Sequence, residues 1–222
     1  MSSAPLLDVV IPVFNGDKTL NDAVQSVLNQ RGIKTRVIVV DAGSTDQTAE
    51  LMLSMNSKRV ITLFTDEKLF AGAARNLGLA HCTAPWLSFL DADDLWPPDR
   101  SVRLLQAITE PKSQIAIGES VTFKLSEKDE SQIRNRAPCS GNFLIARQTF
   151  NKVGQFKESL PVGEFVEWFA RARTYGINEV EVSVTALQRR SHALNTSRWR
   201  RNAYGTSILK IVKEHRIRNR KK

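Results

Sequence analysis

The chain has 222 residues, of which 41% are hydrophobic and 25% charged, and this composition suits one sizeable soluble α/β domain. No apolar run approaches the roughly 20 residues that a membrane helix needs. The first residues, Met-Ser-Ser-Ala-Pro, lack the pattern of a secretory signal. The sequence therefore argues against an integral membrane protein and predicts a cytoplasmic location.

The net charge of +9 is unevenly distributed along the chain. Residues 189–222 hold twelve of the 32 Lys and Arg but one of the 23 acids, so residues 1–188 hold 20 basic and 22 acidic residues. We expect a near-neutral domain over 1–188 and a basic C-terminal segment over 189–222. That segment could bind the phosphate groups of a substrate, anionic lipid headgroups at the inner face of a membrane, or nucleic acid. Alternatively, it could be a solvated end of the chain.

Strands and helices are predicted to alternate in the first half. Apolar, β-branched runs predict strands at 6–14, 36–40, 60–64 and 86–90. Apolar residues spaced three and four apart predict a helix at 19–30. A capping Asp46 or Thr45 predicts a helix through about Met55, and 71–81 is predicted to be a helix with small residues on one face. The alternation indicates an α/β fold, with a mostly parallel sheet and helices on both faces.

The second half is less regular. Its predicted elements are a helix at 97–108, a strand at 114–124, an exposed loop at 126–137, a strand at 141–146, a helical turn at 148–153, a helix at 164–175, a strand at 179–187 and a helix at 203–218. The two cysteines, Cys82 and Cys139, match no metal or redox spacing and are expected to be reduced.

Polar residues follow three of the predicted parallel strands. Asn15, Asp41 and the Asp91–Asp94 run each come directly after an apolar run. Right-handed crossovers bring such loops to one edge of the sheet, where ligands of these folds bind. Asp41 could accept a hydrogen bond from a base N–H or a ribose hydroxyl.

The acidic run is the strongest candidate for chemistry. Asp91, Asp93 and Asp94 lie within four residues, and carboxylates this close repel one another unless a cation compensates. Oxygen ligands suit Mg²⁺ or Mn²⁺. The alternative is a capping cluster ahead of Pro97. The glycine patterns that bind phosphate in dinucleotide oxidoreductases and P-loop enzymes are absent, which argues against both classes.

Four segments, in order over about the first 100 residues, resemble motifs of family 2 glycosyltransferases, which have the GT-A fold. They are Val10-Ile11-Pro12-Val13-Phe14-Asn15, Val40-Asp41-Ala42-Gly43-Ser44-Thr45-Asp46, Gly72-Ala73-Ala74-Arg75-Asn76-Leu77-Gly78 and Leu90-Asp91-Ala92-Asp93-Asp94. The resemblance implies a single domain in which residues 1–110 bind a nucleotide sugar and residues 111–188 bind the acceptor.

The resemblance also implies roles for individual residues on the donor side. Pro12, Val13 and Asn15 would line the nucleoside pocket, and Asp41 would read the base, commonly uracil. Arg75 would reach toward the diphosphate of the donor. Asp91 would contact the ribose or a water bound to the metal, and Asp93 would bind the metal and the diphosphate directly. The alternative for Arg75 is a surface ion pair with an acid of the same edge.

The family usually places its catalytic base in a Glu-Asp pair at the start of a helix. Here Phe165 stands where the Asp is expected, so Glu164 is the preferred base and Glu167 the fallback. The alternative is that both are solvated helix acids. After the last predicted strand, the resemblance implies that Arg189 and Arg190 bind the diphosphate.

His192 completes this set as a candidate ligand of the metal or the diphosphate, in a segment expected to close over the donor. The function predicted is metal-dependent, inverting transfer from a nucleotide-diphosphate sugar, with UDP favoured. The acceptor would be a glycan, lipid-linked or peptide hydroxyl. Because little chain remains to bind it, the 126–137 loop, a peripheral membrane contact or a second subunit of a homo-oligomer would complete that site.

Two other functions remain open. A sugar-phosphate nucleotidyltransferase would need a Gly-rich basic loop after the first strand, and residues 12–16 do not provide one. A non-catalytic basic binding protein would use the C-terminal segment, but no nucleic-acid motif accompanies that segment, so nucleic acid is not expected to be the partner.

Overall fold

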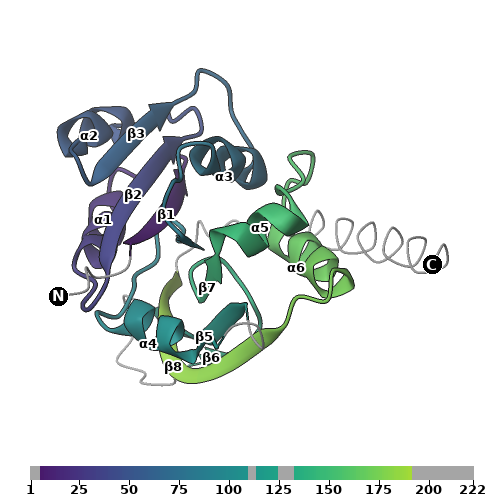
Figure 1. The fold of residues 1–222 in the computed structure, drawn as a ribbon. Helices are drawn as coiled ribbons and strands as arrows, with labels where there is room; N and C mark the ends of the chain where they lie inside the picture. Colours follow the sequence, from purple (N-terminus) through teal and green to yellow (C-terminus); the bar gives the residue numbers. More distant parts are fainter. Residues whose placement is uncertain (1–5, 110–113, 125–132, 192–222) are drawn as a thin grey trace.

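The computed structural model describes residues 6–109, 114–124 and 133–191 (Figure 1). The helix expected at 203–218 and the candidate ligand His192 lie outside these residues. Within them, no helix is both long enough and apolar enough to cross a membrane.

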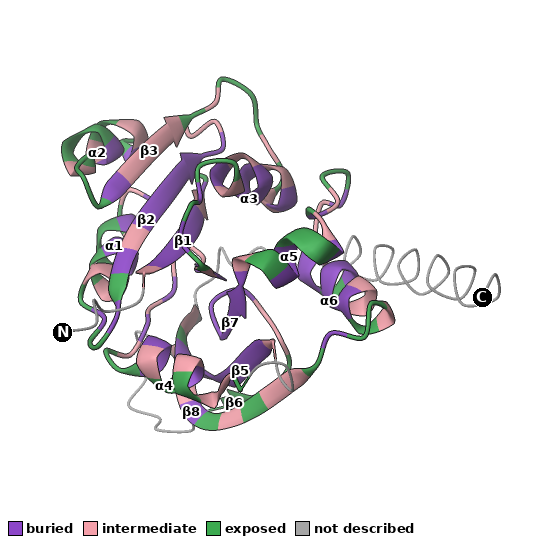
Figure 2. Cartoon of the chain, viewed as in Figure 1, coloured by how far each residue is buried: buried purple, intermediate pink, exposed green. Residues whose placement is uncertain are grey.

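Four parallel strands form the first part of the sheet, in the order β3-β2-β1-β4. Their bounds are β1 Leu6–Val13, β2 Lys34–Asp41, β3 Val60–Phe64 and β4 Trp86–Phe89. They are the four strands that the apolar runs predict. Most residues of β1 and β2 are buried, because helices cover both faces of the sheet (Figure 2).

The helices of the first two crossovers lie on one face of this sheet, and the helix of the third lies on the opposite face. They are α1 Leu20–Leu28, α2 Thr48–Met55 and α3 Ala71–Leu79. Leu20 of α1 and Met52 of α2 belong to one buried cluster, whereas Ala74 of α3 belongs to another on the far face. Gly78 lets α3 approach closely, since a Cβ there would lie 2.5 Å from Val10 Cγ1.

The second half extends the same sheet with antiparallel strands. Its elements are α4 Arg100–Ala107, β5 Ile115–Lys124, β6 Ile133–Asn135, β7 Phe143–Ala146, α5 Arg147–Val153, α6 Glu164–Thr174 and β8 Glu179–Ser191. β7 pairs antiparallel with β4 and β5, and β8 pairs parallel with β5. The α/β class with a mostly parallel sheet is confirmed.

Two of the differences from the expected elements arise from pairing with β5. The described part of the 126–137 loop contains β6, whose exposed residues pair with β5, so the prediction of a loop there is wrong for 133–135. β8 runs to Ser191 instead of ending at 187, and so it crosses the boundary expected between 188 and 189. Backbone pairing with β5 forms β6 and lengthens β8, although the residues concerned are mostly polar.

A cluster of aromatic rings joins the two halves and fixes the start of α6. Phe89 of β4 lies edge-on to Phe156 and Phe165, with ring centroids 5.2 and 5.6 Å apart. Phe165 also packs against Phe143 of β7 at 5.7 Å. This packing sets the N-terminal turn of α6 beside the end of β4, where the acidic loop begins.

Candidate functional site

The loops after β1 and β2 are joined by hydrogen bonds at one edge of the sheet. The Asn15 N–H donates to Ser44 Oγ at 2.9 Å, and Asn15 Oδ1 accepts the N–H of Thr45 at 2.8 Å. Asp41 Oδ1 accepts the N–H of Ser44 at 2.9 Å. Asn15 has a φ of 55°, a left-handed conformation that Asn tolerates better than most residues. The expected convergence of these loops is therefore present.

Residues expected to line the nucleoside pocket differ in exposure. Pro12 is half-buried, while Val13 and Asp41 are buried, and the side chain of Val13 belongs to the core. The exposed ring here is that of Phe14, with Lys68 Nζ 3.8 Å from its centroid. No pattern in the sequence pairs Lys68, from the loop after β3, with this ring.

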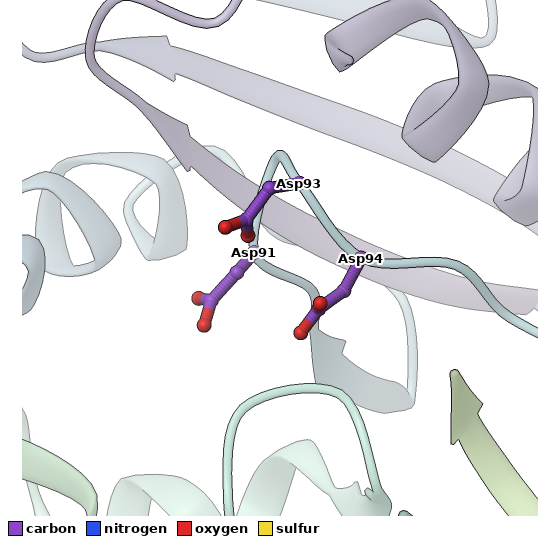
Figure 3. A group of neighbouring side chains, drawn as sticks. All are labelled: Asp91, Asp93 and Asp94. Carbon is purple, nitrogen blue, oxygen red and sulfur yellow. The ribbon is translucent and has the colours of Figure 1, made fainter. Parts of the chain in front are cut away.

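The acidic loop follows β4 at the same edge. Carboxylate oxygens of Asp91, Asp93 and Asp94 all lie within 4.8 Å of one another and gather on one side of the loop (Figure 3). Asp91 and Asp93 are half-buried, and Asp94 is buried. Burial, together with the charges of Asp91 and Asp93, raises the pKa of Asp94 to about 8. Such crowding of oxygen ligands fits a hard divalent cation such as Mg²⁺ or Mn²⁺.

Arg75 of α3 connects the acidic loop with α6. Its Nη2 lies 2.5 Å from Asp91 Oδ1, and its Nη1 lies 2.5 Å from Glu164 Oε1. Nη2 also donates to Ser140 Oγ at 3.3 Å, and the guanidinium lies 4.6 Å from the ring centroid of Phe165. Arg75 is only 2% exposed and its partner Asp91 is half-buried, so this is not the surface ion pair that the sequence left open.

Glu164 and Glu167 occupy different surroundings although both begin α6. Glu164 faces Arg75 and, through it, the acidic loop. Glu167 instead binds Arg171 Nε at 2.9 Å and lies 3.6 Å from Lys157 Nζ. Both are buried, so neither is the solvated helix acid that the sequence left open. The geometry places Glu164 with the candidate site and Glu167 in a separate ion-pair network.

The end of β8 reaches the acidic loop. Arg189 Nε lies 3.8 Å from Asp94 Oδ2. Burial opposes the charge of Arg189, but the carboxylates of Asp94, Asp91 and Asp93 prevail and raise its pKa. Arg190 instead directs its guanidinium to Asp22 of α1, 2.7 Å away. Arg189 is therefore beside the acidic cluster, and Arg190 is held at α1.

Ser140 is a site residue that the sequence analysis missed. It lies in the turn before β7, which Asn142 stabilises by donating to the carbonyls of Gly118 and Ala137. Arg100 donates to Gly141 O at 2.8 Å in the same turn. The sequence of this polar turn does not indicate that Ser140 contacts Arg75, which is distant in the chain.

Comparison with known proteins identifies the family. The sequence model of glycosyl transferase family 2 matches residues 8–167. The succinoglycan biosynthesis protein ExoO of Rhizobium meliloti is 32% identical over 117 residues, which are 53% of this chain and 34% of that protein. The uncharacterized glycosyltransferase RP339 of Rickettsia prowazekii is 25% identical over 96% of this chain and 75% of its own length.

Solved structures share the fold. TarS of S. aureus superposes with a TM-score of 0.67 at 16% identity, over 83% of this chain and 36% of that one. Its fragment 1–349 in complex with UDP has a TM-score of 0.67 at 17% identity, over 83% of this chain and 60% of that one. The expected GT-A fold is confirmed. Against three curated relatives, the chain spans 34%, 39% and 41% of their lengths. With the match over residues 8–167, the chain belongs to glycosyl transferase family 2.

Proposed function

We propose that this protein transfers a sugar from a nucleotide-diphosphate sugar, with UDP as the nucleotide, to an acceptor hydroxyl with inversion. The observation that carries the proposal is that the buried Arg75 joins Asp91 and Glu164 by ion pairs, at the sheet edge that also holds Asp41. Ligands of open α/β sheets bind at this edge. A structural relative with this fold has been solved in complex with UDP.

The donor side is assigned as follows. Pro12, Val13 and Asn15 border the nucleoside, and Asp41 reads the base. In this proposal Asp93 and Asp91 hold Mn²⁺ or Mg²⁺, which supplies positive charge for the diphosphate. His192 and Arg190 remain proposed ligands of the metal or the diphosphate; Arg190 would first have to leave Asp22. Arg189 is better placed to bind the diphosphate, because it is already beside the acidic cluster.

Transfer would be a single displacement. Glu164 takes the proton of the acceptor hydroxyl as its oxygen forms a bond to the anomeric carbon. The bond from that carbon to the diphosphate oxygen breaks, and the nucleoside diphosphate leaves with the electron pair. Arg189 stabilises the departing charge. Arg75 holds the Glu164 carboxylate close to Asp91, because its guanidinium binds both side chains.

The acceptor would be a glycan, a lipid-linked sugar or a peptide. We propose a cytoplasmic location, with the basic segment 189–222 providing peripheral contact at the inner face of a membrane, and a homo-oligomer as an alternative means of completing the acceptor site. The same segment is the basis for the competing function of a non-catalytic binding protein.

Calorimetry with UDP tests the donor site. UDP should bind only weakly without Mn²⁺ and at least tenfold more tightly with it, because the metal offsets the charge repulsion between diphosphate and carboxylates. Asp93→Ala should abolish the gain, and Asp66→Ala, an exposed acid after β3, should not. Metal-independent UDP binding would contradict the metal assignment.

Two results would favour the other functions. Formation of nucleotide sugar from a sugar phosphate and UTP would indicate a nucleotidyltransferase. Salt-sensitive binding of DNA without any UDP binding would indicate a basic binding protein.

A further inference from the structure

The acidic loop is joined to the far end of the chain's last described strand. Leu95 N donates to Gln188 O at 3.0 Å, and Gln188 N donates to Leu95 O at 2.9 Å. β4 pairs with β7, β7 with β5 and β5 with β8, and this isolated bridge links the loop after β4 directly to β8. The bridge lies at the residue that follows the three aspartates.

Asp94 strengthens the same junction. Its Oδ1 accepts the N–H of Arg190 at 3.0 Å, and its Oδ2 lies 3.8 Å from Arg189 Nε. The Asp94 side chain is 4% exposed, whereas that of Asp91 is 36% exposed. One Asp94 oxygen is thus hydrogen-bonded to β8 and the other faces Arg189, whereas a ligand approaching from solvent meets Asp91 more readily.

The side chains of the two arginines that follow this junction, Arg189 and Arg190, contact different parts of the protein. The side chain of Arg190 is 11% exposed and binds Asp22 on α1 at 2.7 Å. The side chain of Arg189 is 39% exposed and lies beside the acidic cluster. Because neighbouring strand residues point to opposite sides, fixing the Arg190 backbone also fixes the direction of Arg189.

We propose that Asp94 is a positioning residue that fastens β8 to the donor loop and holds Arg189 beside Asp91 and Asp93, and that it is not a third metal ligand. The proposal rests on the proposed function only where it concerns Arg189 and the diphosphate. The fastening itself needs an oxygen acceptor at residue 94 and does not need a charge there. Asparagine can supply that oxygen, and alanine cannot.

Hydrogen exchange tests the fastening without any donor. In the absence of metal, the Arg190 amide should exchange at least about tenfold faster in Asp94→Ala than in the wild type, because the amide loses the oxygen that accepts its hydrogen bond. In Asp94→Asn it should exchange within about threefold of the wild type. Unchanged protection of Arg190 in Asp94→Ala would overturn the proposal.

Metal dependence separates a fastening residue from a ligand. In UDP binding, Asp94→Asn should keep the half-saturating Mn²⁺ concentration within about threefold of the wild type, whereas Asp93→Asn should raise it at least about tenfold. If the half-saturating Mn²⁺ concentration rose equally in both variants, Asp94 would be a metal ligand and the proposal would be overturned. This comparison decides the matter even if Asp94→Ala does not fold.

A double substitution tests the link to Arg189. Asp94→Ala should lower sugar transfer in the wild type but cause little further loss in an Arg189→Ala background, because the two residues act together. If the losses of sugar transfer from the two substitutions were fully additive, Asp94 would not act through Arg189. If the wild type binds no UDP at all, the proposed function fails, and the exchange experiment still tests the fastening on its own.

Discussion

Two glutamates one helical turn apart, both buried, have different partners. Glu164 binds Arg75, which binds Asp91. Glu167 binds Arg171, whose guanidinium also donates to the carbonyls of Val153 and Gln155. At the scale of single residues, Glu164 is thus linked to the acidic loop, and Glu167 holds the loop before α6.

Substituting each glutamate by glutamine should therefore give different results. Glu164→Gln should lower transfer at least about 100-fold while Mn²⁺-dependent UDP binding persists, because a general base contributes about that much. Glu167→Gln should lower the free energy of unfolding by about 1–3 kcal/mol and leave the activity per folded molecule near that of the wild type. Transfer assays and urea denaturation check both. Full transfer by Glu164→Gln would remove it as the base.

At the scale of elements, α3 is the part that brings the two halves together. Gly78 lies against β1, while a Cβ at Gly72 would come within 3.0 Å of Lys157 O. Asn76 donates to Phe156 O at 2.9 Å and to Glu158 Oε1 at 3.0 Å, and its Oδ1 accepts the N–H of Phe156 at 3.0 Å. The Gly72–Gly78 motif thus has a packing role beside the presentation of Arg75.

Asn76→Ala should destabilise the protein by about 1–3 kcal/mol, since it leaves buried backbone groups of Phe156 without partners. The matched control is Asn21→Ala, an exposed asparagine in α1, which should change stability by no more than about 0.5 kcal/mol. Thermal or urea unfolding measures both. Equal small effects would mean that the contacts of Asn76 contribute nothing to holding the 156–158 segment.

At the scale of the whole molecule, Arg100 is a buried cation between the two halves of the chain. It is fully buried and lies 3.8 Å from the ring centroid of Trp96. It donates to Gly141 O at 2.8 Å and Phe143 O at 2.9 Å. Burial lowers its pKa to about 9, so it still carries its charge at neutral pH. Through Gly141 it supports the turn that presents Ser140 to Arg75.

Arg100→Leu should lower the free energy of unfolding by about 1–3 kcal/mol, because it removes donors from buried carbonyls. It should also weaken UDP binding in the folded protein, because the Ser140 turn loses support. Arg103→Leu is the control, since Arg103 is exposed on the same helix and should change neither quantity appreciably. Unfolding curves and calorimetry measure the two effects. A more stable Arg100→Leu would show that the cost of burying the cation exceeds the value of its bonds.

The sequence by itself determined the four parallel strands, the helices between them and the convergence of Asn15, Asp41 and the acidic loop. These follow from local apolar periodicity and from the handedness of crossovers, which need no knowledge of distant contacts. They suffice for the parallel part of the sheet and for the edge at which these loops meet.

Only the tertiary structure decided which glutamate faces the site, that Ser140 touches Arg75, and that Asp94 binds the end of β8. It also turned the polar residues 133–135 into a strand. Each of these depends on a partner far away in the chain. A polar side chain shows by its type that it needs a partner, but its neighbours in sequence do not show which one the fold will bring.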